Sequence, residues 1–180
     1  MKAEARVVGF DDGPFSFGDA RAPVAAVVTR GAWYVEGMFR TSVAVDGTDA
    51  TERLADALLS SRFGHEVRLV FLDGVTYGGF NVVDVEALHR RLGVPVLAVS
   101  AGVPDLEAMR AAMERHVGEW RRPWEALERC RFSLLETAEG PLAWTGAGIS
   151  ADDVPRTLAQ YTVLGYRPEA LRLAGLVARA

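Results

Sequence analysis

A short apolar run in the middle of the chain constrains the fold more than any other segment. Residues 67–72 have the sequence Val-Arg-Leu-Val-Phe-Leu, which predicts a buried strand. The run stops at Asp73-Gly74, and a glycine-bearing loop follows over residues 75–79. Ligands of α/β sheets bind outside the carboxyl ends of the strands, so a carboxylate at this point is well placed for chemistry. Asp-Gly is also a common turn dipeptide, and a simple turn is the alternative interpretation of the same residues.

The elements around this run follow a defined order. Strands are predicted at residues 4–10, 24–30, 33–45, 67–72 and 94–99. Helices are predicted to begin after Asp49, Asn81, Pro104-Asp105 and Ser150, and a last helix runs from about Pro168 to Ala180. A hairpin is predicted over residues 132–145, between the helix that begins after Pro104-Asp105 and the helix that begins after Ser150, with a turn at residues 145–148.

Three antiparallel strands with short connections, followed by two parallel strands joined through helices, are the layout of a ribonuclease H-like domain. We therefore predict an α/β fold of this type, with a mixed sheet flanked by helices. A length of 180 residues predicts a single domain over residues 1–180.

Composition narrows the class of protein. The net charge of −4 is not that of a protein that binds nucleic acid by bulk charge, although a local basic patch is compatible with it. Cys130 is the single cysteine, which excludes an internal disulfide and fits a reducing compartment. The polar N-terminus has no signal-peptide pattern, and no window approaches the roughly 18 apolar residues of a membrane span. We expect a cytoplasmic protein.

Acidic residues lie on three of the predicted strands, two of them at strand ends. Asp11-Asp12 follows the first predicted strand, Asp73 ends the fourth, and Glu36 lies within the third. The ends of strands one and four are neighbours in the predicted sheet, and Glu36 is able to reach the same point. Converging carboxylates repel one another, and a divalent cation relieves that repulsion while binding phosphate. Such a metal activates water and stabilises charge on a phosphodiester. For Glu36, the alternative is an edge-strand charge that discourages aggregation.

Other chemical motifs point to structural roles. His65, His89 and His116 match no zinc-binding spacing. Residues 145–148, Thr-Gly-Ala-Gly, lack the Gly-Lys-Ser/Thr ending of a phosphate-binding loop. Trp120 and Trp124 lie at helical spacing, which favours a place in the core over a base-stacking platform.

The same segments resemble a known protein family. The matching residues are 8–15 (Val-Gly-Phe-Asp-Asp-Gly-Pro-Phe), 34–37 (Tyr-Val-Glu-Gly), 45–47 with 49–52, 72–74 (Leu-Asp-Gly), 79–84, 93–96, 104–105, 147–150, and 167–169 with 171–172. They span nearly the whole chain in the expected order. On these residues, the chain is similar to the largely archaeal endonuclease V-like proteins labelled endonuclease dU.

That resemblance carries expectations about chemistry. Endonuclease V has a ribonuclease H-like fold and cuts nucleic acid near deaminated bases with Mg²⁺ or Mn²⁺. The resemblance implies that Asp11, Glu36 and Asp73 are the catalytic, metal-binding residues. Asp12 is a feature of this family whose role the resemblance leaves open, and we expect it to support the metal set. The implied function is a Mg²⁺- or Mn²⁺-dependent endonuclease acting on DNA with a deaminated base such as deoxyuridine.

Two differences leave alternatives open. The Pro-Tyr-Ile-Pro wedge of endonuclease V is missing, and Ser100-Ala101-Gly102 stands where the relatives carry basic residues. Loss of that charge from an already acidic protein weakens the expected attraction to DNA. The alternatives are a non-catalytic module that binds a nucleotide or a protein partner, and a small-molecule phosphohydrolase with the same metal site.

Overall fold

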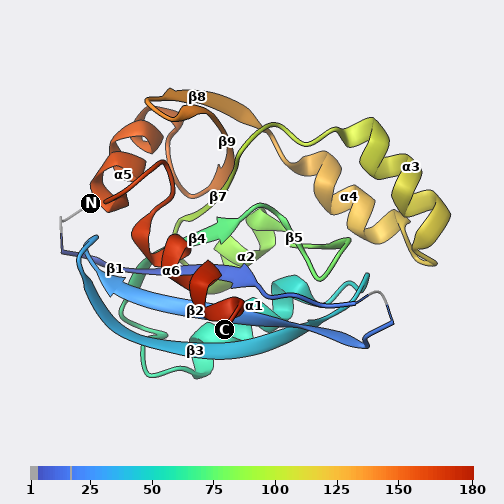
Figure 1. Cartoon of the computed structure of the whole chain (residues 1–180), viewed down its shortest axis with the longest axis horizontal. Helices are drawn as coiled ribbons and strands as arrows, with labels where there is room; N and C mark the ends of the chain where they lie inside the picture. Colours follow the sequence, from blue (N-terminus) through green and yellow to red (C-terminus); the bar gives the residue numbers. More distant parts are fainter. Residues whose placement is uncertain (1–3, 17) are drawn as a thin grey trace.

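The structure, a computed structural model, describes residues 4–16 and 18–180 of the chain (Figure 1). In that part of the chain, seven strands form one mixed sheet in the order β3-β2-β1-β4-β7-β9-β8. These strands are β1 Arg6–Asp12, β2 Arg21–Arg30, β3 Tyr34–Ala44, β4 Val67–Asp73, β7 Val96–Ser100, β8 Ser133–Thr137 and β9 Gly140–Ala147. A separate small ribbon pairs β5 Thr76–Tyr77 with β6 Asn81–Val82.

Helices cover both faces of this sheet. They are α1 Ala50–Ser60, α2 Val85–Leu92, α3 Leu106–His116, α4 Arg121–Arg129, α5 Val154–Tyr161 and α6 Glu169–Ala178, with a 3₁₀ turn at Ala151–Asp153 before α5. None of the helices within residues 4–16 and 18–180 is long and apolar enough to cross a membrane.

The strand pairing confirms the predicted ribonuclease H-like layout. β1, β2 and β3 pair antiparallel in chain order, as their short connections predict. β4 then lies parallel to β1, and β7 lies parallel to β4, with helices in the connections. The carboxyl ends of β1 and β4 are therefore neighbours at one end of the sheet.

Alternation along β1 divides the hydrophobic core into two layers. Val8 and Phe10 point to the face covered by α1 and α2, where they join a cluster that includes Leu58 and Leu88. Val7 points to the opposite face, into the second cluster, which includes residues of α5 and α6. Because side chains of a strand alternate between faces, Asp11 belongs to the α6 face and Asp12 to the α1 face.

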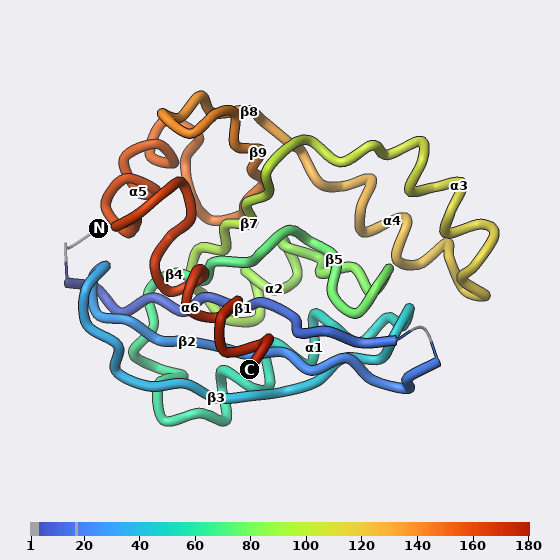
Figure 2. Tube along the Cα trace, viewed as in Figure 1, coloured from blue at the N-terminus to red at the C-terminus, as the bar shows by residue number. Residues whose placement is uncertain are grey.

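Helix α6 lies directly on β1, and the C-terminal end of the trace crosses β1 and β2 (Figure 2). The contact is possible because β1 carries Gly9 at the crossing point. A Cβ at Gly9 would lie 2.4 Å from the backbone nitrogen of Leu171 and 2.6 Å from the carbonyl oxygen of Ala170. The absence of a side chain at Gly9 thus sets how closely α6 approaches the end of β1.

Three local predictions differ from the structure. The helix predicted to begin after Asn81 begins after Asp84, whose carboxylate accepts the N–H of Ala87. Asn81 is instead buried, and its side-chain oxygen accepts the N–H of Ala50 at the start of α1. Residues 145–147 are not a turn, because β9 continues through Ala147 and pairs with β7.

The third difference is helix α4, which no predicted helix covers. Its Pro123 lies in the first turn, where a missing N–H is tolerated. Trp120 and Trp124 are partly buried and pack against the first hydrophobic cluster, at the edge of the core rather than within it.

Candidate metal centre

Asp11 and Asp73 come together because they end adjacent parallel strands. The register pairs Phe10 of β1 with Leu72 of β4, so the next residues on the two strands are the two aspartates. Neighbouring strands lie about 4.8 Å apart. Asp73 shares the face of Leu69 and Phe71, which is also the face of Asp11. The sheet therefore places two carboxylates side by side beneath α6.

Asp11 is an acidic side chain in an almost fully buried position. It is 3% exposed, and its Oδ2 is buried without a hydrogen-bond partner among the described residues. Burial, followed by the nearby charge of Asp73, raises the pKa of Asp11 to about 7. Burying a carboxylate oxygen without a hydrogen bond destabilises the folded state. Binding of a proton or a cation to Asp11 would relieve that cost.

Asp12 lies beside the glycine loop on the other face of β1. Its Oδ2 accepts the N–H of Gly78 at 2.8 Å. Next to it, the hydroxyl of the buried Tyr77 donates to the carbonyl oxygen of Phe10 at 2.8 Å. Burial raises the pKa of Asp12, while the hydrogen bond from Gly78 acts in the opposite direction. The loop after β4 is thus fastened to the end of β1, which fixes the strand ends relative to each other.

Asp11, Asp12 and Asp73 together form what we call the acidic centre. Two arginines from the C-terminal part of the chain lie beside it. Arg167 Nη1 donates to Asp73 Oδ2 at 2.9 Å. Arg179 Nη2 lies 3.8 Å from Asp11 Oδ2, and its Nη1 donates to the carbonyl oxygen of Gly175 in α6. Sequence reasoning assigned neither arginine a role. Arg167 is 94 residues from its partner, so no local spacing marks the pair.

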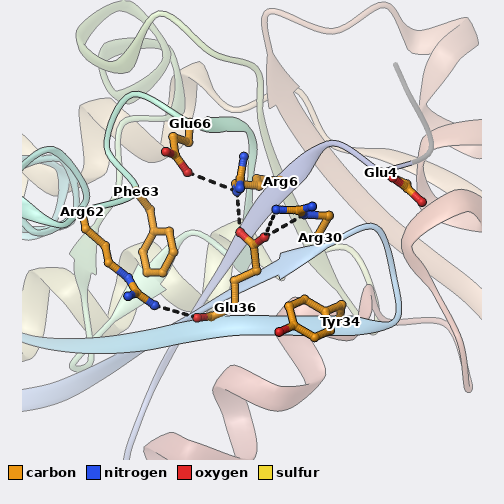
Figure 3. Close-up of a pocket in the computed structure, with 8 residues that line it drawn as sticks. All are labelled: Glu4, Arg6, Arg30, Tyr34, Glu36, Arg62, Phe63 and Glu66. Atoms are coloured by element: carbon orange, nitrogen blue, oxygen red, sulfur yellow. Dashed lines mark hydrogen bonds and ion pairs between the residues drawn. The ribbon is translucent and has the colours of Figure 1, made fainter.

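Glu36 lies elsewhere in the structure (Figure 3). Its place on β3 is level with Val28 and Thr29 of β2, which pair with Val8 and Val7 near the start of β1. With the side chains that surround it, including Phe63, it faces the α1 side of the sheet. The structure therefore brings Asp11 and Asp73 together, places Asp12 beside them, and does not bring Glu36 to them.

A salt-bridge cluster holds the Glu36 carboxylate. Arg6 forms an ion pair with it, and Arg30 Nε donates to Oε1 at 2.7 Å (Figure 3). Arg62 donates to the Glu36 carbonyl oxygen at 2.8 Å, and Glu66 pairs with Arg6 at 3.2 Å. Burial alone would raise the pKa of Glu36, but the two arginine hydrogen bonds outweigh it and lower the pKa. These residues line an open cavity of about 740 Å³.

We expect Glu36→Gln to leave Mn²⁺ affinity unchanged and to lower stability by about 0.5–1 kcal/mol, because Arg6 and Arg30 lose the charge of their shared partner but remain in contact with water. Calorimetric Mn²⁺ titration and thermal unfolding measure the two effects. Glu139→Gln, in the exposed β8–β9 turn, is the matched control. A loss of Mn²⁺ binding in Glu36→Gln would instead support the role in metal binding predicted from the sequence.

The acidic centre offers oxygen ligands from separate strands rather than a preformed cage. Among residues 4–16 and 18–180, no group of three or more His, Cys, Asp or Glu side chains is close enough together to hold a metal ion. In this arrangement Asp73 is turned to Arg167, and Asp12 to Gly78. Asp11 Oδ2, by contrast, is buried and accepts no hydrogen bond from the described residues.

The strand order and the paired aspartates at the ends of β1 and β4 define a ribonuclease H-like protein. Solved endonuclease V structures share this fold at low sequence identity. The catalytic domain of human endonuclease V superposes with a TM-score of 0.60 at 16% identity, covering 97% of this chain and 80% of that one. Endonuclease V of Ciona intestinalis, in complex with a 24mer DNA containing an inosine, gives a TM-score of 0.56 at 15% identity over 94% and 82%.

The chain belongs to the endonuclease dU family, whose model matches residues 3–180. A UPF0215 protein of Thermococcus gammatolerans is 44% identical over 184 aligned residues, covering 100% of this chain and 93% of the relative. A solved structure from Archaeoglobus fulgidus, described as a protein of unknown function, has a TM-score of 0.85 at 31% identity, with 97% and 96% of the two chains covered. The family resemblance inferred from the sequence is confirmed.

Proposed function

We propose that this protein is a divalent-metal-dependent endonuclease that hydrolyses a phosphodiester of DNA near a deaminated base such as deoxyuridine. The observation that carries the proposal is Asp11 Oδ2, buried without a hydrogen-bond partner among the described residues, beside Asp73 at the strand ends of a ribonuclease H-like sheet. Membership of the endonuclease dU family supports the nuclease class. The DNA in the Ciona endonuclease V structure supports DNA as the substrate class.

The residues of the acidic centre suit Mg²⁺ or Mn²⁺. Hard divalent cations prefer carboxylate oxygens, and Mg²⁺ is usually bound by one or two carboxylates together with substrate phosphate oxygens. Asp11 and Asp73 would hold the ion, with Asp12 in support, whereas Glu36 lies outside this set in the structure. The bound ion would supply charge stabilisation on the phosphodiester and an activated water.

The protein's own groups prepare this site. The Tyr77 hydroxyl and the Gly78 N–H fix the loop after β4 to the end of β1, so the carboxylates start from defined positions. Helix α6 covers Asp11, and Gly175 leaves room for it: a Cβ there would lie 2.5 Å from Asp11 Oδ2. Water is therefore kept from one side of the carboxylate, which strengthens its interaction with a cation.

The decisive experiment is cleavage of defined oligonucleotides. Wild-type protein with Mg²⁺ or Mn²⁺ is expected to cut strands that contain deoxyuridine or hypoxanthine and to spare the undamaged sequence. Asp73→Asn is expected to lower the rate by about 10³-fold, since metal ligation provides several kcal/mol of transition-state stabilisation. Asp152→Asn, on the exposed turn before α5, is the matched control. Equal activity of wild type and Asp73→Asn would refute the proposal, and hydrolysis of dUTP without cleavage of DNA would indicate a phosphohydrolase.

Metal binding should depend on pH in a defined direction. A cation at Asp11 must displace the proton that this carboxyl group retains up to about pH 7. We expect Mn²⁺ affinity to rise as pH increases, approaching about tenfold per unit below pH 7, and to level off above it. Calorimetric titrations at several pH values measure this. An affinity that is flat between about pH 5 and about pH 7 would show that the cation does not compete with a proton on Asp11.

A further inference from the structure

Arg167 occupies a position that the proposed metal chemistry leaves unexplained. It directly precedes Pro168, whose carbonyl oxygen accepts the N–H groups of Leu171 and Arg172 in the first turn of α6. The backbone at this point is therefore fixed by the start of a helix. From there, the side chain reaches across to Asp73 at the end of β4 and donates at 2.9 Å.

The two arginines of the acidic centre are not equivalent. The Arg179 side chain is 60% exposed and lies 3.8 Å from the nearest Asp11 oxygen, beyond hydrogen-bond distance. The Arg167 side chain is 30% exposed and makes a direct hydrogen bond to an aspartate that is itself 16% exposed. Arg167 is thus the inner counter-ion of the two neighbouring carboxylates.

A divalent cation at this place would compete with Arg167. Both need the Asp73 carboxylate, and two positive groups on one carboxylate repel each other. A phosphate bound to the cation restores negative charge at the same point. Guanidinium groups bind phosphate oxygens through paired N–H donors, which makes phosphate the natural new partner of a displaced arginine.

From this geometry we propose that Arg167 is the phosphate-binding arginine of the acidic centre, paired with Asp73 in the metal-free protein and released to a substrate phosphate when a divalent cation binds. This inference rests on the proposed function for its substrate, a phosphodiester of DNA. It also places a basic group at the site although Ser100-Ala101-Gly102, at and after the end of β7, carries none. The positive charge comes from the C-terminal part of the chain instead.

Two binding measurements test the exchange without requiring cleavage. Arg167→Ala is expected to bind Mn²⁺ several-fold more tightly than wild type, because the competitor for Asp73 is gone. With Mn²⁺ at saturation, the same variant is expected to bind thymidine 5′-monophosphate about tenfold more weakly, since the guanidinium contact is lost. Arg167→Lys keeps the charge but not the paired N–H donors. Its affinities for Mn²⁺ and for the nucleotide should lie between those of wild type and Arg167→Ala. Arg172→Ala is the matched control, because Arg172 is paired with Glu169 within α6.

The outcomes separate this inference from the proposed function. Unchanged or weaker Mn²⁺ binding in Arg167→Ala, or unchanged binding of the nucleotide, would overturn the role of Arg167. If both binding shifts occur while the wild type cuts no damaged DNA, the endonuclease proposal fails and the phosphate role of Arg167 stands. If the wild type cuts DNA, Arg167→Ala is expected to lower kcat by about 10²-fold, as loss of one transition-state donor does.

Discussion

Replacing Asp11 with asparagine is expected to abolish cleavage and, at the same time, to make the metal-free protein more stable. The activity should fall by about 10³-fold or more, because a neutral amide is a poor ligand for Mg²⁺ or Mn²⁺. The stability should rise by about 0.5–2 kcal/mol at about pH 8, because the variant buries no charge beside Asp73. The two effects have opposite signs, which a general folding defect would not produce.

The gain in stability should depend on pH. The pKa of Asp11 is raised to about 7 in the folded protein, whereas an unfolded aspartate titrates near pH 4. Between these values the folded state holds a proton that the unfolded state has released, so wild-type stability falls as pH rises from about 4 to about 7. The difference between Asp11→Asn and wild type should therefore be near zero at about pH 4 and constant above about pH 7.

Thermal unfolding without metal, at several pH values, measures this difference, and added Mn²⁺ should reverse it by stabilising the wild type more than the variant. Asp152→Asn, at an exposed position, should show neither effect. A variant that is less stable than wild type throughout this range would show that the buried Asp11 charge does not destabilise the fold, and a variant that retains full activity would remove Asp11 from the metal site.

The parts of this molecule that follow from local sequence were predictable. The apolar run ending at Asp73 is β4, and Asp11 ends β1 beside it, because parallel strands share one carboxyl edge. The hydrophobic patterns fixed which segments pair, and the topology then brought two of the predicted acidic residues together. Asp12 was placed correctly near the same edge, although alternation turns it to the other face.

The remaining features depend on partners that are distant in sequence. The pattern around Glu36 gives its strand but not its neighbours, and three arginines contact this residue once β1, β2 and the end of α1 are in place. Arg167 likewise meets Asp73 only in the folded structure, where the C-terminal part of the chain returns to β4. A charged side chain takes whichever counter-charge the tertiary structure supplies, so neither its propensity nor its spacing reveals the partner.

A single methyl group added at Gly9, in the variant Gly9→Ala, should damage both the fold and the acidic centre. The new Cβ would lie 2.4 Å from the Leu171 nitrogen and 2.5 Å from the Ala170 carbonyl carbon, and backbone atoms of a helix cannot move aside singly. Helix α6 must shift as a whole, at a cost of about 1–3 kcal/mol. Because Arg167 lies just before α6 and Arg179 directly follows it, the shift would also displace the two arginines of the acidic centre.

We therefore expect Gly9→Ala to unfold at a lower temperature and to lose about 10²-fold in cleavage, as small misplacements of reacting groups do. Thermal unfolding and the oligonucleotide assay measure the two losses on one preparation. Gly102→Ala is the matched control, since a Cβ there meets no atom within 4 Å. If Gly9→Ala were as stable and as active as Gly102→Ala, α6 would not be seated on β1 in solution, and the burial of Asp11 that underlies the whole site would have to be abandoned.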